Sequence, residues 1–95
     1  MSQSMLCVFA YDSPDDRRRA RIARTLEDVA DRVQGSVFEG WLSERQLEET
    51  WRRVQQVVDP AADDVRVYRL CSYCLQQARV LGPQPRQAAA EYWIV

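Results

Sequence analysis

At 95 residues the chain is long enough for one domain and too short for two, and we treat residues 1–95 as a single domain. Its formal net charge of −1 argues against a protein that coats nucleic acid by bulk electrostatics, because such proteins carry a clear basic excess. The sequence shows no secretory leader and no apolar run long enough to span a bilayer, so we expect a cytoplasmic protein with no membrane partner.

The first predicted element is a buried strand. Residues 1–4 are short and polar, and we expect them to form a disordered tail. The continuous apolar run over residues 5–11 is typical of a central strand covered on both faces. It ends at Tyr11 and Asp12, and a carboxylate at the end of a strand can hold a divalent metal.

A helix is predicted to follow over residues 14–31. Ser13 is its expected cap, and Pro14 suits the first helical position. The buried stripe of this helix is expected to contain the apolar residues Ile22, Leu26, Val29 and Ala30.

The same helix carries the dense positive stretch of the sequence, because five of the 13 arginines fall within residues 17–24. The arginines expected to face solvent or a ligand are Arg17, Arg18, Arg21 and Arg24. Guanidinium groups match phosphate oxygens in a bidentate way, so these residues are candidates for nucleic-acid binding. The alternative is a solvated helix face paired with Glu27 and Asp28.

The rest of the chain predicts a hairpin, a helix and a strand. Residues 32–43 alternate and contain two glycines, which favours two strands joined by a bend or bulge. Ser43 and Gln46 form a capping pair for a helix over residues 44–58, and residues 65–70 alternate as a strand. The resulting order predicts an α+β domain of the ferredoxin-like βαββαβ type.

Two features lie outside this frame. The apolar end of residues 83–95 is expected to add a further C-terminal strand, either to its own sheet or, as we favour, on a partner subunit. Cys71 and Cys74 form one C-x-x-C, and we expect them to pack as small apolar residues where the last strand ends. A zinc site would need ligands from a second copy, and a thioredoxin-like motif belongs at a helix start that we do not expect here.

Taken together, these segments resemble the CRISPR-associated Cas2 proteins, which act in the acquisition of new spacers. The matching segments are Tyr11-Asp12, Asp15-Asp16, the arginine-rich helix start, Arg32-Val33-Gln34, Ser36-Val37-Phe38-Glu39, Leu42-Ser43, Gln46-Leu47, Val67 to Cys71, and Cys74. The segment departs from the family pattern at Gly35, where an aromatic residue commonly follows the glutamine.

The resemblance implies a homodimer in which one Asp12 from each subunit faces the other and the two share Mg²⁺. By similarity, the residues needed for cleavage in nuclease members correspond to Tyr11, Asp12, Arg19, Arg21, Arg32 and Phe38. Asp12 would hold the metal, the arginines would hold phosphate, and Phe38 would stack or shape the site. Each has a plainer alternative, since Asp12 could cap the following helix, and Tyr11 and Phe38 could be core residues.

The resemblance implies two possible functions, and the fold alone leaves a third open. The first, which we favour, is an adaptation protein that bridges Cas1 integrase subunits and binds duplex DNA through phosphates. The second is a magnesium-dependent endonuclease acting on RNA or double-stranded DNA. The third is a stand-alone ribonuclease toxin of related fold, because a fold does not fix a function.

Overall fold

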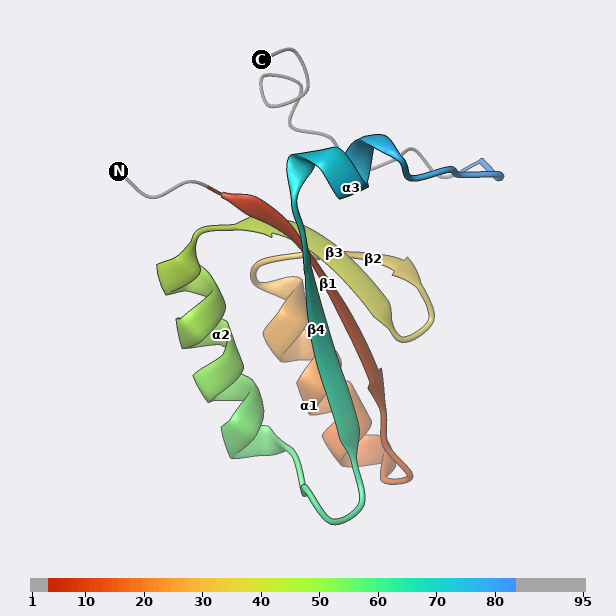
Figure 1. Cartoon of the computed structure of the whole chain (residues 1–95). Helices are drawn as coiled ribbons and strands as arrows, with labels where there is room; N and C mark the ends of the chain where they lie inside the picture. Colours follow the sequence, from red (N-terminus) through yellow and green to blue (C-terminus); the bar gives the residue numbers. More distant parts are fainter. Residues whose placement is uncertain (1–3, 84–95) are drawn as a thin grey trace.

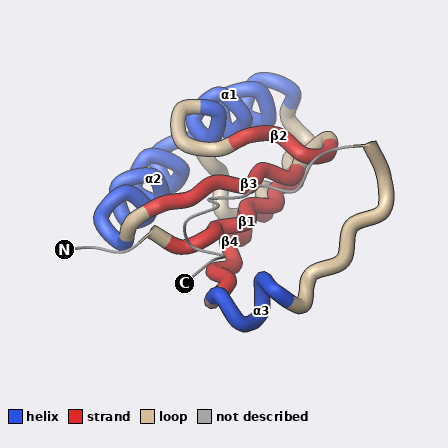
Figure 2. Tube along the Cα trace, turned by 90° about the horizontal axis from the view of Figure 1, so that it is seen from above, coloured by secondary structure: helices blue, strands red, loops and turns tan. Residues whose placement is uncertain are grey.

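The structure is a computed structural model that describes residues 4–83, and it confirms the predicted ferredoxin-like arrangement (Figure 1). Its elements are β1 (Met5–Asp12), α1 (Asp16–Glu27), β2 (Asp31–Gln34), β3 (Val37–Leu42), α2 (Glu44–Val57), β4 (Asp64–Leu70) and α3 (Ser72–Gln76). The strands form one antiparallel sheet in the order β2-β3-β1-β4. Helices α1 and α2 cover one face, and α3 lies beyond the other (Figure 2). The extra strand predicted within residues 83–95 lies, from residue 84 on, outside the described part.

Strand β1 is central, as its apolar run predicts, and its two faces differ. Cys7, Phe9 and Tyr11 point toward α1 and α2 and are buried. They form one core with apolar residues of the other elements: Ile22, Leu26, Phe38, Leu42, Leu47 and Val54. Each large side chain buried this way contributes roughly 1.5–3 kcal/mol. Because side chains alternate along a strand, Val8, Ala10 and Asp12 point to the other face, which we call the open face.

Helix α1 is shorter than predicted at both ends. Asp15, rather than Ser13, is the N-cap, and its carboxylate accepts a hydrogen bond from the Arg18 backbone N–H at 2.8 Å. The helix ends at Glu27, because the Leu26 carbonyl accepts from the two N–H groups that follow in the loop, those of Val29 and Ala30. The prediction that Val29 and Ala30 lie within the helix is therefore wrong, although both pack against the core from the loop.

The hairpin of β2 and β3 agrees with the sequence prediction, but its two glycines do different things. Gly35 lies in the turn, and a Cβ there would meet no atom within 4 Å. Gly40 lies inside β3 against the loop after α1, where a Cβ would be 2.6 Å from the Val29 carbonyl oxygen. Gly40 thus permits close packing of backbone on backbone.

Helix α2 begins as the sequence predicts. The Gln46 backbone N–H donates to Ser43 Oγ at 3.2 Å, and the Ser43 N–H donates to Gln46 Oε1 at 2.8 Å. This reciprocal capping box fixes the helix start at Glu44. The helix ends at Val57, and Val58 is its C-cap.

The expectation that Cys71 and Cys74 pack as apolar residues is wrong. Both are exposed, and they lie at the start of the short helix α3, which the sequence analysis missed. Leu75 is the buried residue of this helix, with 3% of its surface exposed. A single buried side chain is enough to pack so short a helix against the sheet, and both cysteines face solvent.

Candidate nucleic-acid interface

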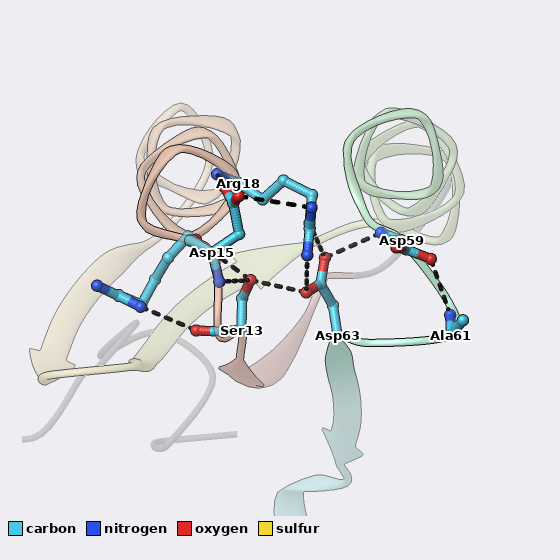
Figure 3. Close-up of polar contacts among 7 residues, drawn as sticks. Ser13, Asp15, Arg18, Asp59, Ala61 and Asp63 are labelled. Atoms are coloured by element: carbon cyan, nitrogen blue, oxygen red, sulfur yellow. Dashed lines mark hydrogen bonds and ion pairs between the residues drawn. The ribbon is translucent and has the colours of Figure 1, made fainter.

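A polar network joins the end of β1 to the start of β4 (Figure 3). Asp63 is at its centre, and its side chain has no exposed surface. Arg18 donates to both carboxylate oxygens of Asp63, from Nε at 2.8 Å and from Nη2 at 3.2 Å. Ser13 Oγ adds a hydrogen bond at 2.7 Å, and the Asp59 backbone N–H adds one at 2.9 Å. These donors stabilise the ionised form, so the Arg18 guanidinium first, and the others with it, hold the pKa of Asp63 well below its usual range.

Arg19 is also held by its own chain. Its Nη1 donates to the Ser13 carbonyl at 2.8 Å, and its guanidinium pairs with the exposed Asp16. Arg18 therefore fastens the helix start to the start of β4, and Arg19 fastens it to the end of β1. The prediction that both are free to hold phosphate does not match these contacts.

Arg17, Arg21 and Arg24 differ from these two. All three are exposed, and none forms an ion pair within residues 4–83. They follow one another at positions i, i+4 and i+7, which places them on one side of α1. The alternative pairing with Glu27 and Asp28 is wrong, because Glu27 pairs with Arg32 at 3.6 Å and Asp28 pairs with Arg53 at 2.7 Å.

This side of α1 borders a hollow of about 400 Å³ between the two long helices. Arg21 and Arg24 of α1 line it together with Arg53 of α2, and Asp28 is the carboxylate at its edge. Three guanidinium groups against one carboxylate leave the hollow with a net positive charge. We call these residues, with Arg17, the arginine surface. Arg53 was missed by the sequence analysis because nothing in its own helix marks it.

Tyr11, Phe38 and Arg32 form a separate group. Tyr11 and Phe38 are 5% and 0% exposed, and their ring centroids lie 6.1 Å apart in the core. The Arg32 guanidinium carbon lies 5.0 Å from the centroid of the Phe38 ring, and Nη1 donates to the Gly35 carbonyl at 2.6 Å. The core alternative for Tyr11 and Phe38 is therefore correct, and Arg32 covers the edge of that core.

Asp12 points away from this aromatic group. It is exposed at the end of β1, and Asp64 of β4 lies directly opposite it in the strand register. It does not cap α1, because Asp15 does. Asp64 is held by Arg66 at 2.9 Å, and this hydrogen-bonded guanidinium lowers the pKa of Asp64. Within one chain, the Asp12 side chain thus lies beside Asp64, on the opposite face of the sheet from the buried rings of Tyr11 and Phe38.

This end of the sheet offers a suitable but incomplete donor set for Mg²⁺. The described residues contain no group of three or more side chains that could hold a metal ion. Protein magnesium sites need only one or two carboxylates when water and phosphate oxygens supply the rest. The exposed carboxylate of Asp12 meets that requirement, and a second carboxylate would have to come from Asp64 or from another copy of the chain.

The profile of the family described as CRISPR associated protein Cas2 matches residues 5–78, which span β1 to the end of α3. The chain belongs to the Cas2 family. This confirms the resemblance drawn from the sequence.

Within residues 4–83, no helix is both long enough and apolar enough to cross a bilayer.

Known relatives cover most of this Cas2 chain. A CRISPR-associated endoribonuclease Cas2 of Synechocystis is 41% identical over 84% of this chain and 87% of its own length. A CRISPR-associated endonuclease Cas2 of Thermus thermophilus is 42% identical over 84% of each chain. The first name specifies cleavage of RNA, and the second specifies no kind of nucleic acid.

Two solved structures share the fold. Streptococcus pyogenes Cas2 superposes with a TM-score of 0.71 and 26% identity, covering 82% of this chain and 100% of that one. A chain of a partial Cas6-RT-Cas1–Cas2 complex superposes with a TM-score of 0.72 and 24% identity, covering 90% and 96% of the two chains. The α+β architecture is therefore that of solved Cas2 chains.

Proposed function

We propose that this protein is a CRISPR adaptation protein whose homodimer binds duplex DNA through phosphates and bridges Cas1 integrase subunits. The observation that carries the proposal is the arginine surface, with three exposed arginines of α1 that have no acidic partner in the described chain. Duplex DNA carries about one negative charge per 1.7 Å of its axis, so a row of free guanidinium groups can contact several phosphates at once. Such contacts position a duplex without reading its sequence.

The open face of the sheet supports a dimer. Val8, Ala10 and Val37 are half-buried on this face, and Tyr68 beside them is 52% exposed. A second copy packed on this face would cover these apolar groups. Because Asp12 points to the same face of β1, the two Asp12 carboxylates would approach each other across a two-fold axis. The related chain solved in a complex with Cas1 supports Cas1 as the partner.

Magnesium-dependent hydrolysis is the second candidate function, and the names of the endoribonuclease and endonuclease relatives favour it. One Asp12 from each subunit would hold Mg²⁺, which would activate water and offset charge on the phosphate being attacked. The arginines of this chain would keep the phosphate in place. Tyr11 and Phe38 would act only by supporting β1 and β3 from the core, since neither is exposed.

One variant separates the two functions. Asp12→Asn keeps the size of an exposed side chain and removes its charge, so it should fold normally. We expect it to support spacer acquisition in cells with Cas1 and to bind duplex as the wild type does. Magnesium-dependent cleavage by the purified protein should disappear. Loss of acquisition by a folded Asp12→Asn protein would contradict the adaptation role as proposed.

Duplex binding itself is tested by fluorescence anisotropy on several unrelated sequences over a range of salt. We expect equal affinities for all sequences and a steep fall with salt, with a log–log slope of about −0.9 for each phosphate neutralised. A preference for one sequence, or binding that does not change with salt, would show that phosphate contacts do not dominate.

A further inference from the structure

Two cysteines at the start of helix α3 have no role in the proposed duplex binding. Cys71 and Cys74 are free and exposed, and Cys71 is the N-cap of the helix. The Cys74 backbone N–H donates to Cys71 Sγ at 3.4 Å. The two sulfurs thus lie on the same side of one helical turn.

We infer that Cys71 and Cys74 form a redox-active dithiol that closes reversibly into an intramolecular disulfide. This inference goes beyond the adaptation role and does not rest on it. Residues three apart in a helix have Cβ atoms about 5–6 Å apart, and a disulfide needs about 3.5–4.5 Å. The first turn of a five-residue helix can close that difference, because few other hydrogen bonds hold it. A C-x-x-C that follows a strand and opens a helix is also the arrangement in which such pairs do redox chemistry.

The two cysteines have different roles. Hydrogen bonds from the Cys74 N–H, and then from its thiol, stabilise the thiolate and lower the pKa of Cys71. The neighbouring sulfur raises the pKa of Cys74, which therefore keeps its proton at first. Cys71 is the attacking sulfur, and Cys74 is the resolving one.

The reaction is thiol–disulfide exchange with a low-molecular-weight disulfide such as oxidised glutathione. The Cys71 thiolate attacks one sulfur of that disulfide, and the other sulfur leaves as a thiolate. Cys74 then loses its proton to solvent, and its sulfur attacks Cys71 and displaces the second small thiol. Two cysteines are oxidised by two electrons, and one small disulfide is reduced to two thiols.

The disulfide would fix how α3 sits on the sheet. Leu75 is adjacent to Cys74 and is the buried anchor of the helix. It lines an apolar groove with Leu6 and Leu70 of the open face. A cross-link over the first turn removes unfolded conformations of this segment, so Leu75 should leave its buried position less often.

The test treats the full-length protein with oxidised glutathione and measures intact mass, free thiols and disulfide-linked peptides. Buried Cys7 is the internal reference, since it should react with an alkylating agent only after denaturation. We expect the wild type to lose two hydrogens and two thiols while remaining one chain in mass. Glutathione held on both exposed cysteines without a bond between them, or a disulfide joining two chains, would overturn the inference.

Two single variants test the roles. Cys74→Ser should stop at a stable glutathione adduct on Cys71, because the resolving sulfur is absent. Cys71→Ser should react more slowly than Cys74→Ser, because Cys71 in Cys74→Ser keeps the backbone N–H that donates to its sulfur, whereas the remaining Cys74 in Cys71→Ser gains no such donor. Equal rates for the two variants would refute the assignment of roles.

Hydrogen exchange tests the structural consequence. We expect oxidised wild type to exchange the amides of residues 74–77 at least about threefold more slowly than reduced protein. The Cys71→Ser, Cys74→Ser double variant should show no change with oxidant. Identical exchange in the oxidised and reduced wild type would show that the cross-link does not hold α3.

Discussion

The five arginines of residues 17–24 divide into two sets by their surroundings. Arg18 and Arg19 bind groups of their own chain, chiefly Asp63 and the Ser13 carbonyl. Arg17, Arg21 and Arg24 have no such partner within residues 4–83. One set fastens the start of α1 to β1 and β4, and the other set is free to bind phosphate. A count of positive charges in a sequence therefore overstates the charge available to a ligand.

The largest expected effect is a loss of stability when Asp63, the buried partner of Arg18, is replaced. Asp63→Asn places an amide NH₂ among donors and leaves Arg18 without its carboxylate. We expect the melting temperature Tm to fall by on the order of 10 °C, because a buried group loses its hydrogen-bond partner. Asp64→Asn is the matched control, since Asp64 is exposed and pairs with Arg66 at the surface. Its Tm should change by less than about 2 °C, and equal losses in the two variants would refute the central role of Asp63.

The second effect is on duplex affinity, and it should separate the sets. Arg21→Ala should weaken binding by roughly tenfold and reduce the salt slope by about one, with Tm nearly unchanged. Arg18→Ala should do the reverse, lowering Tm and leaving affinity close to that of the folded wild type. Arg45→Ala removes an arginine that is 89% exposed on α2 and serves as the control for lost net charge. Similar losses of affinity for Arg21→Ala and Arg45→Ala would show that the effect reflects lost net charge and not a contact made by Arg21.

The third effect is a dependence of stability on pH that arises from Asp63, the partner of Arg18. The pKa of Asp63 is lower in the folded chain than in the unfolded chain, so its ionisation stabilises the fold above its unfolded pKa. That contribution is complete at neutral pH and is lost as pH falls below about 4. The difference in Tm between wild type and Asp63→Asn should be constant from about pH 5 to pH 8 and shrink below pH 4. A difference that grows on acidification would have the wrong sign for this mechanism.

The fold was predictable from the sequence because its signals are local. The apolar run of β1 and the Ser43–Gln46 capping pair each specify an element without reference to the rest of the chain. The start of α1 was not predictable, because Ser13 and Asp15 are both good caps. The choice depends on Asp63, which lies 50 residues from Ser13 in sequence and takes its hydroxyl.

The candidate site was only partly predictable for the same reason. Spacing correctly places Arg17, Arg21 and Arg24 on one side of a helix, and it cannot show which neighbouring arginines are occupied. Asp63, the partner that occupies Arg18, belongs to a turn with no motif of its own, where the Asp59 backbone N–H donates to its carboxylate. Likewise, α3 was missed because five residues are too few for a periodic pattern.

The smallest expected effect comes from the one carboxylate at the arginine surface. Asp28 holds Arg53 at 2.7 Å and opposes the charge of Arg21 and Arg24 in the same hollow. Asp28→Asn removes that negative charge and releases Arg53 toward a ligand, so duplex affinity should rise by about two- to threefold. Stability should not suffer, because Asp28 is the C-cap of α1, where a negative charge is unfavourable.

Glu49→Gln is the matched control for this change, since it removes the same charge from an exposed site on α2 away from the hollow. If Glu49→Gln tightens duplex binding as much as Asp28→Asn does, the gain reflects net charge alone. If only Asp28→Asn tightens it, the phosphate lies close to the hollow between α1 and α2. Arg53 then joins the arginines of α1 as part of one binding surface.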